Sequence, residues 1–254
     1  MLDESFEDMN ELRRLKYKVE VDWNALPHGT NTLDGVADNI EALRFTREKN
    51  SHRGISRLKS LRTLVAFCVN QECLEEISEL PLIETLYLPQ LAAFNLQCLS
   101  KCRALRHLVI KGGTKIPSLS WLGDLPPLNS LLLENLKLVT DFSDVQSLQS
   151  LNALGIEGSM WTNQRVNTFE PIGQLLRLEA LFLTACRPIA DGLQPLCDLR
   201  QLRYLEIAGR FPDADFLALR KALPRLGCDW FQAIDEHGSI KAYLKAKVKL
   251  LAKD

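Results

Sequence analysis

Hydrophobic residues along the chain follow a mixed rhythm. In residues 80–91, LPLIETLYLPQL, the apolar side chains fall at Leu80, Ile83, Leu86, Leu88 and Leu91, so that their spacing is three, three, two and three. An amphipathic helix repeats its apolar residues every three to four positions, and a half-buried strand alternates them. The stretch therefore predicts a compound unit, in which a short strand with two inward leucines follows turns of three-residue period.

The same pattern recurs along most of the chain. The phrase apolar-x-x-Leu-x-apolar begins at residues 40, 61, 83, 105, 128, 151, 178 and 202, at intervals of 21 to 27 residues. A unit of this length cannot bury its leucines alone, whereas stacked units share one continuous core. The period predicts a solenoid in which each phrase contributes one strand.

These phrases resemble the leucine-rich repeat family over about residues 36–226, and the short L-x-x-L-x-x-L-x-x-L-x-L units are most similar to its SDS22-like class. The resemblance implies an α/β repeat fold, a leucine-rich repeat solenoid curved into a right-handed horseshoe. A parallel sheet of about eight strands would form the concave side, and short 3-10 or turn segments the convex side. The scaffold alone does not specify a function, because many unrelated roles occur on one fold.

The two ends of the chain depart from the period. Residues 1–39 are interpreted as an N-terminal cap, because Tyr17, Val19, Val21 and Trp23 alternate and predict a strand over the first repeat. Residues 40–226 hold the eight repeats. Residues 227–254 are interpreted as a C-terminal cap strand and a lysine-rich tail.

The C-terminal region carries three local patterns. Residues 212–226, PDADFLALRKALPRL, predict a helix that Asp213 or Asp215 could cap. The segment CDWF at 228–231 is expected to form a ninth, irregular strand. The tail SIKAYLKAKVKLLAKD predicts a helix with one apolar face, although its end also alternates and leaves a hairpin open; that face comprises Ile240, Leu244, Val248 and Leu251.

Alternation along each predicted strand places the third, fifth and seventh residues of each phrase on the concave face and the residues between them inward. The middle concave column reads Arg44, Val65, Tyr87, Val109, Leu132, Gly155, Phe182 and Glu206, and the column beside it reads Thr46, Phe67, Pro89, Lys111, Glu134, Glu157, Thr184 and Ala208. We expect an exposed apolar stripe with charged ends, which suits a protein partner. The candidate contact residues are Arg44, Val65, Phe67, Tyr87, Val109, Lys111, Leu132, Glu134, Phe182 and Glu206. Alternatively, these residues fill a tightly curved face or are covered by the N-terminal segment.

One repeat is longer than the others and suggests a second surface. Its 27 residues include the surplus segment GSMWTNQRVNTFEP, residues 158–171. Extra residues in a repeat form a loop on one face, often the functional one. Met160, Trp161 and Arg165 have the composition of an interface hot spot. Alternatively, Trp161 folds back onto neighbouring repeats.

Composition and charge disfavour several classes of partner and activity but do not identify a function. The formal charge is −1, and no apolar run is long enough for a membrane span, so we expect neither a nucleic-acid nor a membrane partner. The odd number of cysteines, seven, and an acidic N-terminus without a signal-peptide pattern predict a reduced, cytoplasmic protein. Cys98 and Cys102 lack further ligands nearby in the sequence, so no metal or cofactor is expected. No nucleophile or acid–base motif is found, which disfavours an enzyme.

The sequence therefore predicts a monomeric, non-enzymatic protein-protein interaction module that binds a protein through its concave face. It could serve as an enzyme regulator or inhibitor. One alternative is a bacterial immunity or antitoxin-type protein that neutralises a cognate toxin, and another is a structural assembly subunit. A catalytic C-terminal part is disfavoured because residues 227–254 are too few to form a core.

Overall fold

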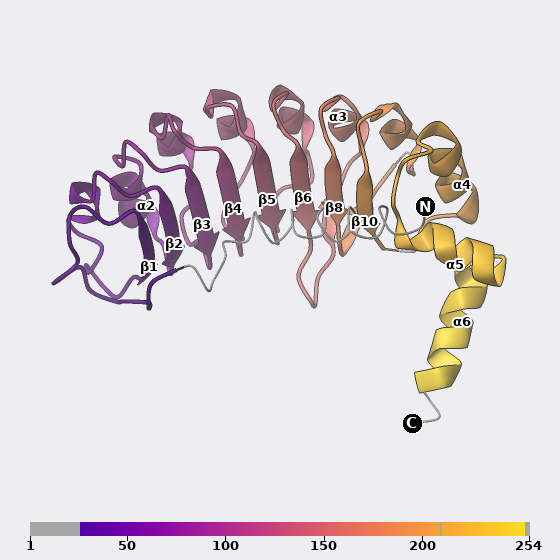
Figure 1. The fold of residues 1–254 in the computed structure, drawn as a ribbon, viewed down its shortest axis with the longest axis horizontal. Helices are drawn as coiled ribbons and strands as arrows, with labels where there is room; N and C mark the ends of the chain where they lie inside the picture. Colours follow the sequence, from indigo (N-terminus) through magenta and orange to yellow (C-terminus); the bar gives the residue numbers. More distant parts are fainter. Residues whose placement is uncertain (1–25, 191, 209, 252–254) are drawn as a thin grey trace.

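The computed structural model describes residues 26–190, 192–208 and 210–251 and contains one long parallel sheet (Figure 1). Its eight strands follow the order β1-β2-β3-β4-β5-β6-β8-β10. Each strand begins two residues into a phrase of the repeat, so the predicted positions are confirmed. The strands are β1 (Ala42–Thr46), β2 (Thr63–Phe67), β3 (Thr85–Pro89), β4 (His107–Lys111), β5 (Ser130–Glu134), β6 (Ala153–Glu157), β8 (Ala180–Leu183) and β10 (Tyr204–Ile207).

The core of the arc is a stack of inward leucines. The second residue of each strand is a leucine, and successive leucines are partners in the sheet register, as in Leu108↔Leu131 and Leu131↔Leu154. Leu131 is 1% exposed, and this column belongs to one core cluster that runs through the repeats. Because neighbouring strands lie about 4.8 Å apart, each leucine is covered on both sides by its equivalents.

Short helical segments form the convex side, as expected. Figure 1 shows them along the outer edge of the arc, opposite the sheet. They direct apolar side chains into the shared core. The 3-10 segments are η1 (Ile55–Arg57), η2 (Gln97–Lys101), η3 (Ser120–Asp124), η4 (Ser143–Ser147) and η5 (Gln194–Asp198), and the α-helical ones are α2 (Gln71–Ile77) and α3 (Glu170–Gly173).

The chain leaves several strands through a left-handed residue. Cys68, Gln90, Gly112 and Asn135 directly follow strands β2 to β5, and their φ angles lie between 57° and 70°. Non-glycine residues adopt this region rarely. Its recurrence at one repeat position shows that each unit makes the same sharp turn out of the sheet.

Three helices form the C-terminal end, namely α4 (Asp213–Ala222), α5 (Asp229–His237) and α6 (Ile240–Leu251). The predicted helix at 212–226 is confirmed, but its expected cap is wrong. The side chain of Asp215 accepts a hydrogen bond from Leu193 N at 3.3 Å, and that of Asp213 accepts one from Ile240 N at 3.1 Å. Both carboxylates therefore connect α4 to other elements.

The expected ninth strand at 228–231 is also wrong. Gly227 forms an isolated parallel bridge with Tyr204, after which α5 begins. The indole Nε1 of Trp230 donates to Ile207 O at 2.6 Å and connects α5 to the end of β10. The helix ends at Gly238, whose φ of 74° is the left-handed conformation common after helices.

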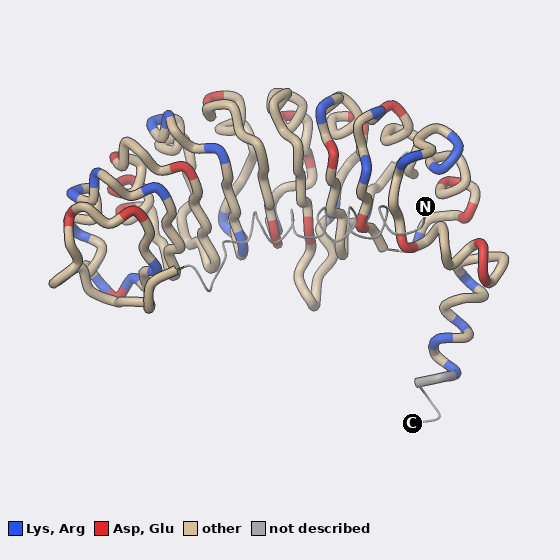
Figure 2. The backbone as a smooth tube through the Cα atoms, viewed as in Figure 1, with Lys and Arg blue, Asp and Glu red and all other residues tan. Residues whose placement is uncertain are grey.

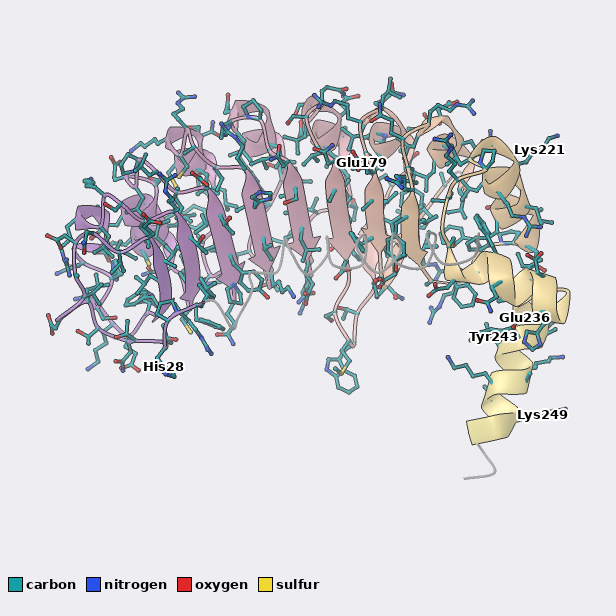
Figure 3. The ribbon with its side chains drawn as sticks, viewed as in Figure 1. His28, Glu179, Lys221, Glu236, Tyr243 and Lys249 are labelled. Carbon is teal, nitrogen blue, oxygen red and sulfur yellow. The ribbon has the colours of Figure 1, made fainter. Side chains whose placement is uncertain are left out.

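The tail is a helix, in agreement with one of the two predictions. Its first turn is capped by Ser239, whose Oγ accepts a hydrogen bond from Ala242 N at 3.1 Å. Of the expected apolar face, Ile240 is buried, whereas Leu244 is 41% and Val248 65% exposed. The helix points away from the arc, with Tyr243 near the α5 end and Lys249 near the far end (Figure 3). Among the described helices, none combines the length and the apolar character that a bilayer span requires.

The described chain starts at the β1 end of the arc, where Figure 3 labels His28. Thr30 pairs with the edge strand, since its N–H donates to Arg44 O at 3.0 Å and its carbonyl accepts from Thr46 N at 2.8 Å. The cap strand predicted for residues 17–23 lies outside the described residues.

Truncation of a leucine in the stack should reduce stability strongly. We expect Leu131→Ala to lower the free energy of unfolding by about 2–5 kcal/mol, because it opens a cavity between adjacent units. Leu138→Ala is the matched control, since Leu138 is 61% exposed and its loss should cost about 0.5 kcal/mol or less. Denaturant titration measures both, and equal midpoints would contradict the assigned register.

Candidate functional site

Four residues of the predicted middle column form a cluster of their own on the concave face. Val65, Tyr87, Val109 and Leu132, here called the concave cluster, are partners in the register of β2 to β5. They share this face as predicted, and they are separate from the main core. Their expected exposure is wrong, because Val65 and Val109 are 0%, Leu132 3% and Tyr87 5% exposed.

Contacts within the described residues account for part of this burial. Leu26 and Phe67 pack against the concave cluster. Gly155 follows Leu132 in the register of β6, and a Cβ on Gly155 would lie 2.1 Å from Leu132 Cδ1. The leucine side chain therefore lies across the glycine, and a larger residue at position 155 would displace it.

A second concave cluster lies toward the C-terminal end of the sheet. Phe182 is 2% exposed and packs with Ala153, Ala180 and Tyr204. The rings of Phe182 and Tyr204 are 5.6 Å apart between centroids. The prediction that Phe182 is an exposed anchor is therefore also wrong.

The charged candidates lie beside these clusters. Arg44 lies over the ring of Phe67 at 5.9 Å, and Lys111 lies over that of Tyr87 at 5.5 Å. The Nζ of Lys111 is 3.7 Å from Glu134, and these side chains are 24% and 26% exposed. Glu206 accepts a hydrogen bond from Thr184 Oγ1 at 2.8 Å. Basic and acidic residues are interspersed along the whole arc (Figure 2).

One more concave column was not among the sequence-derived candidates. It is formed by the first residue of each strand, two positions before the middle column, which the alternation also places on the concave face. It includes a short hydrogen bond of 2.7 Å between His107 Nδ1 and Ser130 Oγ. Burial lowers the pKa of His107. Ser130 is 4% exposed, so its hydroxyl is not accessible to a substrate and the pair acts as a link between β4 and β5.

The cysteine thiols are equally poor candidates for chemistry. All seven are free. Burial raises the pKa of Cys73, Cys102, Cys186 and Cys228 from the ordinary 9.0 to about 12. Since the thiolate is the nucleophile, these four groups are unreactive near neutral pH. No group of three or more potential metal ligands occurs in the described part of the chain.

The inserted segment forms an ordered turn that displays two large apolar side chains. Met160 is 88% and Trp161 87% exposed, so the alternative in which Trp161 folds back is wrong. Ser159 N donates to Thr162 O at 2.8 Å, and the two hydroxyls are 2.7 Å apart. The Oγ of Ser159 also accepts from the backbone N–H of Trp161 at 3.3 Å. The turn therefore closes on itself while its tip points outward.

Gln164 fixes the base of this loop to the preceding repeat. It lies on β7 (Gln164–Val166), which pairs in parallel with β9 (Cys186–Pro188) as a second, two-stranded sheet. The buried side chain accepts from Leu136 N at 2.9 Å and donates to Val139 O at 2.8 Å. Gly158 is required at the other end, because a Cβ there would lie 2.4 Å from Thr162 O. Arg165 is exposed on β7.

Further exposed apolar residues lie in the connections that follow other strands of the sheet. They follow the C-terminal ends of strands, and in a parallel sheet these ends meet at one edge. We call this surface the loop edge, defined by Phe94 (59% exposed), Leu138 (61%), Met160, Trp161 and Ile189 (60%). Figure 1 shows the connection after β6 extending beyond the neighbouring strand ends.

Comparisons with solved structures identify the fold as a leucine-rich repeat solenoid. A leucine-rich repeat protein of Leptospira interrogans aligns with a TM-score of 0.50 and 16% identity, over 72% of this chain and 53% of that protein. Internalin C2 of Listeria monocytogenes aligns with a TM-score of 0.48 and 24% identity, over 61% and 67% of the two chains. A second internalin of Listeria monocytogenes aligns with a TM-score of 0.33 and 19% identity, over 68% of this chain and 61% of that protein.

At these levels of sequence identity, the similarities show a shared fold and do not assign a function. The chain spans 53% to 67% of the length of the three proteins. No protein-family model matches the sequence, and neither does a curated protein. The similarity to the SDS22-like class stays a prediction.

The raised thiol pKa values predict alkaline sensitivity. A thiol with a raised pKa in the folded state contributes full stability below its ordinary pKa near 9, and this contribution is lost as the pH rises toward about 12. We expect the free energy of unfolding to fall by about 1 kcal/mol per pH unit for each such thiol in this range. Denaturant titrations between pH 8 and pH 11 under reducing conditions should show a smaller slope for Cys102→Ala. An unchanged slope would contradict the raised pKa of Cys102.

The hydrogen bonds of Gln164 at the base of the loop give another prediction. Gln164→Ala should destabilise the protein by about 1–3 kcal/mol, because it leaves buried backbone groups of the preceding repeat without partners. Gln146→Ala, at an exposed position on η4, is the matched control. Denaturant titration measures the loss of stability, and amide hydrogen exchange of residues 158–166 measures the loosening of the loop. Equal midpoints and equal exchange rates in the two variants would refute the prediction.

Proposed function

We propose that the protein is a non-enzymatic protein-binding module whose loop edge makes the primary contact with a protein partner. The observation that carries this proposal is the display of Met160 and Trp161 at 88% and 87% exposure on a braced turn. Exposed apolar side chains of this size favour contact with another surface. Because Gln164 and the turn hydrogen bonds already order the loop, binding would lose little conformational entropy.

The composition of the loop edge supports the same proposal. Tryptophan is enriched among residues that dominate binding energy, and such residues work best when less important contacts surround them and exclude water. Phe94, Leu138 and Ile189 are further exposed apolar side chains in connections that follow strands. A hollow beside the loop, lined by Asn163, Arg187, Ile189, Arg210 and Phe211 among others, adds two basic groups.

The concave face is the second candidate surface. Arg44, Phe67, Lys111, Glu134 and Glu206 are at least partly exposed there and would suit a polar contact. The concave cluster itself is buried, so its use as an anchor requires a rearrangement. This difference in accessibility supports the proposal that the loop edge is the primary contact surface.

The kind of partner belongs to the proposal as well. We propose an enzyme that the protein regulates or inhibits in the cytoplasm, with the protein itself monomeric before binding. An immunity or antitoxin-type role and an assembly role are alternatives. Inhibition of the purified partner's activity by the protein would support regulation, whereas binding without any effect would favour assembly.

Substitution at the tip of the loop tests the proposal. Immobilised wild-type protein first captures a partner from the native lysate, and the purified partner is then titrated against each variant by calorimetry. Trp161→Ala combined with Met160→Ala should weaken binding by about 4 kcal/mol, or roughly a thousandfold in Kd, if each residue contributes about 2 kcal/mol. The fold should be unaffected, since both side chains are exposed.

Two controls make the result specific. Leu176→Ala combined with Val248→Ala removes two exposed apolar side chains away from the loop edge and should leave the Kd unchanged. Arg44→Ala combined with Glu134→Ala tests the concave face. Loss of binding in this concave variant, together with full binding by the loop variant, would refute the proposal.

A further inference from the structure

A groove with apolar walls lies beside the last helix. The start of α6 is fixed to the rest of the protein, because Ile240 is 3% exposed and its N–H donates to the carboxylate of Asp213 at 3.1 Å. From there the helix runs away from the arc (Figure 1). The groove, about 540 Å³ in volume, lies between α6 and residues 210–213. It is open on its outer side, where α6 has no neighbouring element (Figure 1).

Apolar side chains continue from the core into this groove. Phe211 lines it, packs against the main core and lies 6.3 Å from Phe216 between ring centroids. On the other wall, the buried Ile240 is followed by Leu244 and Val248, which are 41% and 65% exposed. Residues four apart share one face of a helix, so these three form an apolar stripe about 12 Å long. We call it the α6 stripe.

The charged residues of α6 are all lysines. They are Lys241, Lys245, Lys247 and Lys249, and residues 252–254, outside the described part of the chain, add one lysine and one aspartate. With 3.6 residues per turn, Lys241 and Lys245 flank one side of the α6 stripe and Lys247 flanks the other. The apolar stripe therefore has positive charge along both sides.

The opposite wall and the end of α5 leave this positive charge uncompensated. Arg210 is exposed on that wall. Asp213 also lines the groove, but its carboxylate accepts the N–H of Ile240. The acidic residues at the end of α5, Asp235 and Glu236, bond to side chains of α4 and of α5 itself. The described groove thus combines an apolar interior with a cationic rim.

We propose that the groove beside α6 binds an acidic amphipathic helix of a protein partner. Such a helix places apolar residues three or four positions apart into a groove, and its carboxylates would face the lysines on both sides of the α6 stripe. A stripe of about 12 Å matches two turns of the partner helix. This ligand is separate from the partner of the loop edge, so the two proposals can fail independently.

Two other occupants fit the groove less well. A second copy of the chain in a two-fold pairing of α6 with α6 would bring lysines against lysines, and like charges repel. An anionic bilayer would attract the lysines, but binding of a helix to a bilayer scales with the apolar area that it inserts. Phe211 and Ile240 lie inside the groove, which leaves Leu244 and Val248 as the exposed apolar side chains described on this face.

Binding of synthetic peptides to the full chain tests the proposal. A panel of fluorescent peptides of about four helical turns carries leucine, isoleucine or phenylalanine at helical spacing and glutamate at the flanking positions. Each has a counterpart with glutamine in place of glutamate and a scrambled counterpart of the same composition. Fluorescence anisotropy should show at least one acidic peptide that binds about tenfold more tightly than both counterparts, with a Kd that rises with salt. A panel without such a preference would overturn the proposal.

Variants of α6 locate the bound peptide. Lys241→Glu combined with Lys245→Glu should weaken binding of the acidic peptide about tenfold or more and leave the glutamine peptide unaffected. Leu244→Ser combined with Val248→Ser should weaken binding of both. All four side chains are exposed, so the variants should fold, which circular dichroism verifies.

A matched control separates the groove from a general effect of net charge. Lys221→Glu combined with Arg225→Glu reverses two exposed charges outside the groove and should leave the Kd of the acidic peptide unchanged. Equal weakening by this control and by the variant at positions 241 and 245 would overturn the proposal.

The other two occupants are tested with the same variants. Co-sedimentation with vesicles of phosphatidylserine and phosphatidylcholine should show no binding, and sedimentation equilibrium should show a monomer. Vesicle binding that Lys241→Glu with Lys245→Glu abolishes would reassign the groove to a membrane surface. A dimer that Leu244→Ser with Val248→Ser abolishes would reassign it to a second copy. Either result would overturn the proposal.

Discussion

The structure depends on the in-register stacking of inward leucines. A single repeat exposes its leucines on both sides, and burial is achieved only when the neighbouring unit places its own leucine one strand spacing away. This requirement fixes the strand register, as in Leu131 between Leu108 and Leu154. The helical segments on the convex side are wider than the 4.8 Å strand spacing, so the stack curves toward the sheet.

The leucine stack made the architecture predictable from sequence. The period located all eight strands, and the alternation within each phrase assigned Leu131 to the core and Leu132 to the concave face. Alternation states toward which face a side chain points, but not what lies over that face. Leu26, which belongs to no repeat, packs against the concave cluster, and the side chain of Leu132 lies over Gly155, which has no side chain. Neither contact has a periodic signal.

The C-terminal elements also depend on contacts that the sequence pattern does not predict. Four residues, CDWF, are too few to distinguish a strand from a helix by periodicity, and the hydrogen bond from Trp230 to β10 is a tertiary contact with no local sequence signal. Asp213 and Asp215 have the composition of helix caps, yet both carboxylates bond to distant backbone N–H groups. Local propensity was overridden where tertiary partners were available. The inserted loop was located by its length, but the buried role of Gln164 was not readable from its neighbours.

The long repeat shows how the stack accommodates a functional addition. Leu154 and Leu181 remain partners in the register of β6 and β8 although the inserted loop separates them in sequence. The extra residues are carried by the β7–β9 pair and by the hydrogen bonds of Gln164 at the edge of the solenoid. The tip with Met160 and Trp161 therefore contributes nothing to the core, and its sequence can change without disturbing the stack. On a scaffold whose inward positions are fixed by packing, such an edge is where recognition can vary independently of stability.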